Sequence, residues 1–393
     1  MLIFGGFDLK DFLNDIWEYN ITSQTWSQII PVNKVVPSPR TGTRFAKVGR
    51  KAYMFGGYLN SDPYCSNEMW VFNFDTRAWQ LVKPAAGSPV PVRRNKACIS
   101  MMNSYLVMYG GKGCTTSEDK AGMGDMWLFD LNNSTWTPVR QFNNISGRYD
   151  MTCTVIDDTI HVTHGWNDLI QHTNDYCYAK VNFNTFTANW TCVKNFWTND
   201  ERRDATDGIT WQNSVVIVSG WGDNMLFNDV YMVNMLWQQQ SIVPGSLRKT
   251  LVQPQFDFKE AVAGTAFVLV GNSVITYGGQ SSTGDQSSLL RRYNIEEQSW
   301  STLQPVGTFP SGRSGAGLIL VGDSLYLFGG NSKEFYLNEL YVFSMNLSSW
   351  SLVAPNSHQS SIPSPRAGFT AVSFNNGSMF AIYGGRDGNV LYD

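Results

Sequence analysis

The chain has 393 residues, of which 42% are hydrophobic, 14% aromatic and only 16% charged, a composition typical of a folded β-rich protein with an aromatic core. Its formal net charge of −3, without any run of Lys or Arg, argues against nucleic-acid binding. No apolar stretch approaches the roughly 20 residues of a membrane-spanning helix, and Met1 leads directly into an apolar segment, so we expect neither a membrane segment nor a signal peptide here.

An apolar strand that ends in a glycine turn recurs eight times along the chain. The first glycine of each copy follows the previous one after 51 to 58 residues. A fixed period of this length predicts one closed repeat fold rather than several independent domains. The copies lie at 3–6, 54–57, 108–111, 163–166, 218–221, 276–279, 327–330 and 382–385.

Residues 313–353 show a single repeat clearly. Four short apolar segments with turn signals between them predict one antiparallel sheet. Between the first two segments, Gly322-Asp323 tolerates the positive φ that a two-residue hairpin requires. The four predicted strands, here named A to D, cover 315–321, 324–328, 338–343 and 349–353.

Strands C and D keep a fixed spacing of aromatic residues. An aromatic residue on C precedes a tryptophan on D by seven residues in the pairs Tyr19/Trp26, Phe72/Trp79, Phe129/Trp136, Tyr293/Trp300 and Phe343/Trp350. We interpret these tryptophans as core between sheets, with a stacking platform for sugar or nucleic acid as the alternative. The glycine pairs are interpreted as sharp turns, because no helical pattern follows them to form a phosphate cradle.

The apolar-aromatic-Gly-Gly end of strand B, the Asn-Asp/Glu before C, the aromatic on C and the Trp on D together resemble the kelch repeat over essentially the whole chain. The resemblance implies an all-β fold, a β-propeller of four-stranded antiparallel blades. Repeats four and five depart from the pattern. Trp166 and Trp221 stand at the second glycine position, and Val230 replaces the aromatic on C.

The repeat phase predicts how the propeller closes. Strands B, C and D precede the complete repeats at 2–29, and strands A and B follow them at 366–385. We expect the C-terminal A strand to pair with the N-terminal B–C–D, which gives seven blades and leaves the last B strand surplus. An incomplete eight-blade ring is the alternative. A start and an end in mid-repeat suggest a fragment of a longer chain.

We expect a single propeller over 1–393. The segment 237–260 is predicted to be a loop insertion, because Pro244-Gly245 and Pro254 break it. The approximate repeats are 1–31, 32–86, 87–140, 141–194, 195–242, 243–304, 305–354 and 355–393.

The B–C loops are long and variable, and they emerge with the D–A loops at one end of each sheet. Variable loops on a rigid scaffold are where recognition usually lies. The same end carries an arginine at the entry to most A strands. Such guanidiniums bind carboxylates or phosphates in a bidentate manner, although each could equally tie its own blade to a nearby loop. These candidate ligand-binding residues are Arg40, Arg94, Arg148, Arg203, Arg313 and Arg366.

Repeat four contains three of the four histidines. His161, His164 and His172 lie near Asp168 and Asp175, which makes His164 and His172 the metal candidates. Three-residue spacing on a strand directs His161 and His164 to opposite faces, so we expect no metal, no cofactor and no catalytic residue. The arrangements of copper radical oxidases and of thiocyanate- or nitrile-forming proteins are not visible. A sugar epimerase or mutarotase remains an alternative.

The six cysteines bear on the compartment. Cys177 and Cys192 are symmetric about the C–D turn of repeat four, and Cys65 and Cys114 lie in neighbouring B–C loops, so both pairs are disulfide candidates. Cys98 and Cys153 are expected to pack as small hydrophobes on A strands. Seven glycosylation sequons occur, against roughly five expected by chance for this composition. They begin at Asn20, Asn132, Asn133, Asn144, Asn189, Asn346 and Asn376.

These observations favour a non-catalytic module that binds a protein or an acidic peptide on the B–C/D–A loop face. We expect a monomeric propeller within a larger protein or complex. The sequence does not fix the compartment, and it favours the cytoplasm over an extracellular or secretory location. In kelch substrate adaptors, which this face resembles, similarly placed arginines grip acidic motifs. The alternatives are a carbohydrate-active enzyme and an extracellular adhesion module like the kelch domains of attractin-like receptors, the latter if an N-terminal leader is missing.

Overall fold

The structure is a computed structural model that describes most of the chain. The residues outside the description are 1, 8–11, 21–24, 41, 60, 115–121, 198–206, 212–213, 222–225, 235–236, 239–240, 243–247, 253–261, 282–283, 298, 355–361, 364, 375–378 and 387–393. All regular elements of the described residues are β-strands, so the predicted all-β class is confirmed. The chain forms two compact units, one of residues 42–252 and one of residues 1–41 with 253–393.

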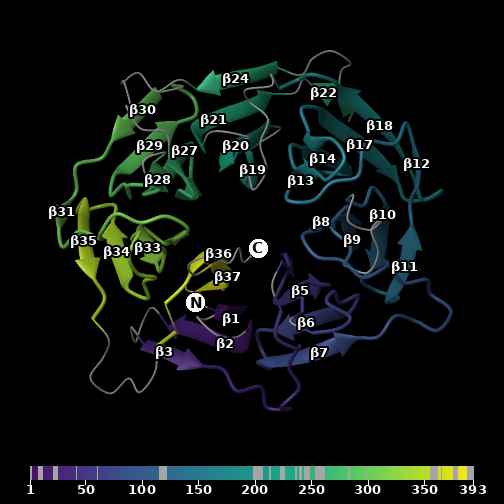
Figure 1. The fold of residues 1–393 in the computed structure, drawn as a ribbon, viewed down its shortest axis with the longest axis horizontal. Coiled ribbons are helices and arrows are strands. Elements are labelled where there is room, and N and C mark those ends of the chain that lie inside the picture. Colours follow the sequence, from purple (N-terminus) through teal and green to yellow (C-terminus); the bar gives the residue numbers. More distant parts are fainter. Residues whose placement is uncertain are drawn as a thin grey trace. The chain divides into compact units, whose positions relative to one another are not determined.

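The unit of residues 42–252 contains four sheets of four or five described strands, which follow one another in chain order (Figure 1). The first sheet is β4 (Phe45–Val48), β5 (Lys51–Phe55), β6 (Met69–Asn73) and β7 (Ala78–Val82). The second is β8 (Cys98–Met102), β9 (Tyr105–Tyr109), β10 (Met126–Asp130) and β11 (Thr135–Pro138). The third is β13 (Thr152–Ile156), β14 (Thr159–Thr163), β17 (Tyr176–Asn182) and β18 (Thr187–Val193), with β12 (Arg140–Phe142) added parallel to β18.

The fourth sheet of this unit corrects the sequence prediction for repeat five. It consists of β19 (Asp207–Trp211), β20 (Ser214–Trp221), β21 (Leu226–Asn234) and β24 (Arg248–Val252). Strand D of repeat five is therefore β24, inside the segment that we expected to be a loop, and the repeat boundary at 242/243 is misplaced. Trp237 at the seven-residue offset belongs instead to a small hairpin of β22 (Trp237–Gln238) and β23 (Ser241–Ile242). A chain that adds such a hairpin between C and D loses the spacing that marks the repeat.

The other unit contains three sheets of four or five described strands. One is β26 (Ala266–Val270), β27 (Ser273–Tyr277), β29 (Leu290–Asn294) and β30 (Ser299–Thr302), beside a short pair of β25 (Val262–Ala263) and β28 (Gln280–Ser281). The next is β32 (Gly317–Val321), β33 (Ser324–Phe328), β34 (Leu340–Ser344) and β35 (Ser349–Leu352), with β31 (Val306–Gly307) parallel to β35. These bounds confirm the A–D strands predicted within 313–353.

The last sheet joins the two ends of the chain. Its order is β3 (Thr25–Gln28), β2 (Phe12–Asn20), β1 (Leu2–Phe7), β37 (Met379–Arg386) and β36 (Ala367–Phe374). We expected the A strand β36 to pair with β1, but the surplus B strand β37 lies between them, parallel to β1 (Figure 1). Insertion of β37 leaves it with a partner on both sides, whereas a surplus strand outside the sheet would have exposed an unpaired edge.

The seven-residue aromatic offset is a cross-strand pair. Phe72 lies opposite Trp79 and Phe343 lies opposite Trp350, with ring centroids 5.2 Å apart in both cases. The same tryptophan position also contacts the last aromatic of strand B in the preceding repeat, as in Phe55 with Trp136 at 5.3 Å. Because Trp79, Trp136 and Trp350 are at most 2% exposed, they are core between consecutive sheets, as predicted, and offer no stacking platform.

Candidate functional site

The arginines at the start of the A strands are buried side chains that connect two loops, and they are called arginine posts. Arg94, Arg148 and Arg313 are each 0% exposed. In each, Nε donates to the carbonyl two residues earlier, as in Arg148 to Ser146 at 3.2 Å. In each, Nη1 donates to the carbonyl sixteen residues later, at the end of strand B. Each guanidinium therefore ties the D–A loop to the adjoining B–C loop.

A carboxylate completes each of these three posts. Arg94 forms a bidentate pair with Asp125 at 2.6 and 2.7 Å, and Arg148 forms one with Asp175 at 2.7 and 3.1 Å. Arg313 donates to Glu339 at 2.9 Å. These acids are the Asp/Glu that precedes strand C in the repeat, a partnership that the sequence did not reveal. Burial alone would raise the pKa of Asp125, but hydrogen bonds from Arg94 and Trp127 and the arginine's charge lower it.

Two further arginines at the start of A strands are also buried. Arg40 and Arg366 are at most 1% exposed, and Arg40 donates from Nη2 to Ser38 Oγ at 2.8 Å. Arg203 lies outside the described residues. The direct grip on a partner's carboxylate that we predicted for these arginines is not what this structure shows, because the described side chains have no surface left and three of them already hold an acid. A charged group is buried only when it is paired in this way.

The arginine posts also correct the alignment of repeat four. The carbonyl sixteen residues after Arg148 belongs to His164, whereas Arg94 and Arg313 reach Gly110 and Gly329 at the same step. His164 has a φ of +58°, close to the +68° of Gly110, and Gly165 matches the second glycine. The histidine thus replaces the first glycine, and Trp166 follows the pair instead of replacing its second member.

The histidines of repeat four are packed into the protein. His164 is fully buried and stacks on Trp197 with ring centroids 4.4 Å apart. His172 packs edge-on against Trp166 at 4.7 Å. His161 contacts the Tyr176 hydroxyl through Nδ1 at 3.2 Å, and burial lowers its pKa to about 3, so the ring is neutral. The metal candidates His164 and His172 thus each pack against a different tryptophan.

The described residues contain one group with metal-ligand spacing, Asp175 with Cys177 and Cys192. It does not fit a metal. The two sulfurs are joined in a disulfide, and the carboxylate is held by Arg148. A thiolate must be free to act as a ligand.

All six cysteines are disulfide-bonded. The structure joins Cys177 to Cys192 and Cys65 to Cys114, the two pairs named from the sequence. It also joins Cys98 to Cys153, which we had expected to pack as separate hydrophobes. The A strands β8 and β13 of successive repeats contact one another, and this contact places two equivalent positions 55 residues apart with Cα atoms 6.0 Å from each other.

The B–C loop of repeat four, residues 166–172, presents an ordered apolar tip. It is a hairpin of β15 (Trp166–Asn167) and β16 (Gln171–His172). At its tip Leu169 is 80% exposed and Ile170 is 54% exposed. The backbone N–H groups of both residues donate to Asn167 Oδ1, at 2.9 and 3.3 Å. The side chain of Asn167 therefore holds two exposed apolar residues in one conformation.

Asp168 fixes the base of this loop. Its Oδ1 accepts hydrogen bonds from Tyr149 and Trp166, each at 2.7 Å, and Lys112 Nζ lies 3.5 Å from its Oδ2. Partial burial acts to raise the pKa of Asp168, but these hydrogen bonds and the lysine's charge lower it overall. Since Lys112 and Tyr149 precede the loop in the chain, one carboxylate links three segments of the unit formed by residues 42–252.

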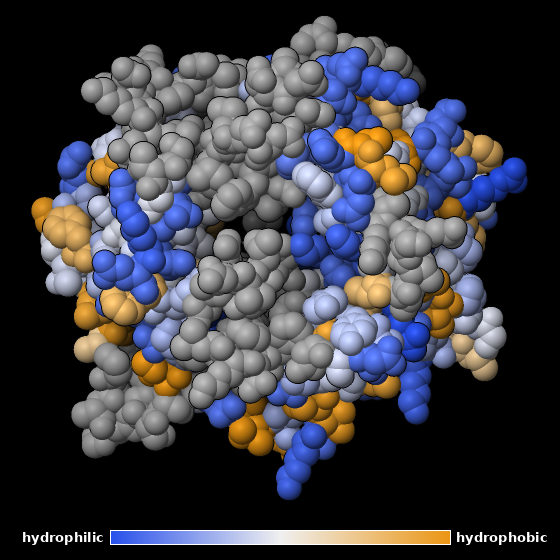
Figure 2. All heavy atoms as spheres, in the orientation of Figure 1, coloured by the Kyte–Doolittle hydropathy of each residue, from blue (hydrophilic) through white to orange (hydrophobic). Residues whose placement is uncertain are grey.

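Other B–C loops also expose apolar side chains. Tyr58 and Tyr64 are stacked at 6.4 Å on the loop of repeat two, and Phe335 is 69% exposed on that of repeat seven. On the face drawn in Figure 2 the coloured residues show small apolar patches separated by hydrophilic ones. Binding through a few anchors fits such a surface better than binding through one broad apolar area.

Comparison with known proteins agrees with the repeat geometry. The family model described as the KLHDC2/KLHL20/DRC7 Kelch-repeats domain matches residues 42–246 and 244–393, and the Kelch motif matches residues 1–29. The chain belongs to the kelch-repeat family. Its sheets are therefore blades of a kelch β-propeller, and the arginine posts are one way in which these kelch blades tie their loops together.

Similar kelch proteins are much longer than this chain. Host cell factor of Drosophila melanogaster is 26% identical over 238 residues, which cover 54% of this chain and 14% of that protein. Host cell factor 1 of Homo sapiens is 27% identical, over 43% of this chain and 9% of that protein. Acyl-CoA-binding domain-containing protein 4 of Arabidopsis thaliana is 23% identical, over 82% of this chain and 47% of that protein. The chain thus spans less than half the length of each.

Within the described part of the chain, no helix has the length and apolar character needed to cross a membrane.

Proposed function

We propose that this chain is a non-catalytic protein-interaction module that binds its partner through the B–C/D–A loop end of its blades. The observation that carries the proposal is the ordered, exposed pair Leu169–Ile170 on the loop of repeat four. Kelch relatives named host cell factor give general support for a scaffold rather than an enzyme, although the chain covers a small part of them.

The loop of repeat four has the properties of a binding anchor. Burial of a Leu or Ile side chain contributes about 1.5–3 kcal/mol. Little conformational entropy is lost on binding when the loop is already fixed, and this loop is held by Asn167 and Asp168. We therefore assign the partner an apolar cavity that receives Leu169 and Ile170.

The arginines no longer support a preference for acidic peptides. The arginines that suggested it are compensated by Asp125, Asp175 and Glu339 within their own sheets. At the loop of repeat four, Lys112 is likewise matched by Asp168. An apolar anchor is the partner chemistry that these contacts support best.

The enzyme alternative finds no support in repeat four. It required that a substrate reach His164 or His172, but these side chains are 0% and 6% exposed. A buried imidazole that packs against an aromatic ring is a packing group, since catalysis needs contact with the reacting atoms.

The experiment compares proteins that co-purify with wild type and with two variants. Leu169→Ser with Ile170→Ser removes the anchor without touching the core. Leu347→Ser is the matched control, because Leu347 is 74% exposed but lies on a C–D turn, at the opposite end of its sheet. We expect partners retained by wild type and by Leu347→Ser to be lost from the double variant at unchanged melting temperature. Equal retention by all three proteins would overturn the proposal.

A further inference from the structure

The pairing of the cysteines points to an oxidising compartment. All six are bonded, and the bonds link repeat two to three, repeat three to four, and the C and D strands of repeat four. Disulfides persist in secreted and luminal proteins and are rare in the cytosol. The six cysteines lie in three repeats, and each one is bonded to another cysteine. This complete pairing fits the secretory route better than the cytoplasm that we expected from the sequence.

One of the exposed glycosylation sequons lies beside a groove. Asn189-Trp190-Thr191 lies on β18, and Asn189 is exposed. Asn189 Oδ1 accepts a hydrogen bond from Asn143 Nδ2 at 2.9 Å. That bond uses the oxygen of the amide, whereas a sugar attaches to the nitrogen Nδ2.

Two other exposed sequons are engaged differently. Asn133 Nδ2 donates to Asp130 at 2.8 Å, and Asn346 Nδ2 donates to Asp323 at 3.4 Å. In both, the nitrogen that would carry the sugar is committed to a carboxylate. Asn189 is thus better prepared for modification than either.

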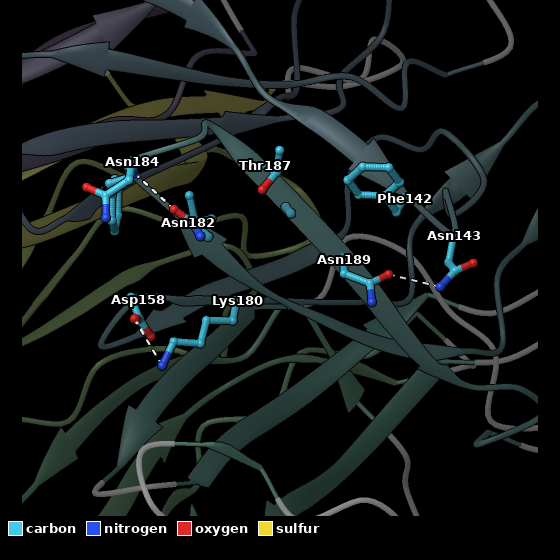
Figure 3. Close-up of a pocket in the computed structure, with 11 residues that line it drawn as sticks. Phe142, Asn143, Asp158, Lys180, Asn182, Asn184, Thr187 and Asn189 are labelled. Carbon is cyan, nitrogen blue, oxygen red and sulfur yellow. Dashed lines mark hydrogen bonds and ion pairs between the residues drawn. The ribbon is translucent and has the colours of Figure 1, made fainter.

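Asn189 also lies in the wall of an open groove of about 910 Å³ (Figure 3). Its lining comes from β12 and the residue after it, from β17, β18 and the turn between them, and from the turn between β13 and β14. Figure 3 shows the ring of Phe142 beside Asn189, and the two residues are register partners on β12 and β18. The volume falls within the roughly 300–1,000 Å³ of small-molecule sites.

The groove lining suits a sugar. The side-chain amides of Asn143, Asn182 and Asn184 line the groove, with the Asn182 oxygen already accepting from the backbone N–H groups of Asn184 and Thr185. Their other amide groups offer donors and acceptors to hydroxyls. Phe142 is 43% exposed and presents an apolar ring on which the C–H face of a pyranose packs. Lys180 and Asp158, paired at 3.4 Å, add polar groups at one end.

We propose that Asn189 carries an N-linked glycan whose first sugars lie in this groove, against Phe142. The glycan comes from a lipid diphosphate-linked oligosaccharide in the secretory pathway. Nδ2 attacks the anomeric carbon, a new N–C bond forms, the C–O bond to the diphosphate breaks, and the lipid diphosphate leaves with the electron pair. Nδ2 gives up one proton to the transferring enzyme's base. This inference is independent of the proposed binding loop.

The modification is tested by peptide mass spectrometry of the protein isolated from its own cells. We expect the peptide containing Asn189 to carry hexosamine-based sugars, and the denatured, unreduced protein to show no free thiols. In secretory expression, Thr191→Ser should keep this glycan and Thr191→Ala should lose it. An unmodified Asn189 peptide from the native protein would overturn the proposal.

The seating in the groove has its own measurement, the rate at which N-glycanase releases the sugar from the folded protein. Phe142→Ala should leave the occupancy of Asn189 unchanged and accelerate release several-fold, because the exposed glycan is easier to reach. Phe335→Ala, an exposed phenylalanine on another loop, should leave the rate unchanged. Equal rates for wild type and Phe142→Ala would show that the glycan does not lie in the groove.

Discussion

Arg148 is fully buried and holds both carboxylate oxygens of Asp175, at 2.7 and 3.1 Å. The same guanidinium donates to the carbonyl of His164 and to Thr173 Oγ1. One side chain therefore connects the entry of strand A, the end of strand B and the start of strand C in repeat four. This arrangement recurs at Arg94 and Arg313, so the arginines belong to the scaffold that positions the loops.

Removal of the arginine from the Arg148–Asp175 pair should destabilise the fold strongly. Arg148→Met leaves Asp175, whose side chain is only 20% exposed, without its cation, and we expect a loss of about 3 kcal/mol in the free energy of unfolding. Arg50→Met breaks an exposed pair with Asp75 and should cost no more than about 1 kcal/mol. Urea denaturation measures both. A near-wild-type stability for Arg148→Met would mean that the post is not structural.

The first glycine of the pair in repeat six should be hard to replace for steric reasons, although His164 occupies the equivalent position in repeat four. Gly278 has a φ of +76°, and a Cβ there would collide with the carbonyl oxygen of Arg313. Gly322 has a φ of +55°, and a Cβ at that position would meet no atom within 4 Å. Gly322→Ala should cost about 1–2 kcal/mol from backbone strain alone, and Gly278→Ala clearly more. Equal losses in thermal denaturation would contradict the collision.

Two of the disulfides should contribute different amounts to the free energy of unfolding, because they close loops of different length. Cys98–Cys153 spans 55 residues and Cys177–Cys192 spans 15. The loop-entropy relation predicts losses of about 4 and about 3 kcal/mol when each pair is replaced by serine. Denaturation of the two double-serine variants under non-reducing conditions checks this order. A larger loss for the shorter loop would speak against the entropic account.

His161 should make the free energy of unfolding decrease as the pH falls below 6.5. Its pKa falls from 6.5 in the unfolded chain to about 3 in the folded protein, because burial disfavours the charged ring. The neutral imidazole is retained without penalty above pH 6.5, and stability is lost as the pH falls from there toward 3, by at most about 1.4 kcal/mol per pH unit. His161→Gln should flatten that part of the unfolding free energy relative to wild type. Identical slopes for both proteins between pH 6.5 and about 4.5 would refute the assignment.

The repeat period and the aromatic offset predicted most of the sheets, since a seven-residue step across a short turn fits one cross-strand pair, as Phe72 with Trp79 shows. Strand β24 escaped prediction because a hairpin separates it from β21 and removes that step. The position of β37 was not predicted because β1 and β37 are both B strands, and either could pair with the A strand β36.

The candidate site was predicted less well than the fold. The arginines were found, but their carboxylate partners lie 26 to 31 residues away, at a distance that local patterns do not reveal. The spacing of sixteen from arginine to strand end was present in the sequence and would have corrected the alignment of His164. The exposure of Leu169 and Ile170 depends on Asn167, which only the folded loop shows.

The most direct test of the binding loop places a photo-crosslinking amino acid at position 170 and, in a second protein, at position 347. Both positions are exposed and apolar in the native chain, but only position 170 lies at the B–C end. The proposed function predicts that illumination in cells joins a partner to position 170 and not to position 347. Crosslinks of equal yield at both positions, or at position 347 alone, would contradict it.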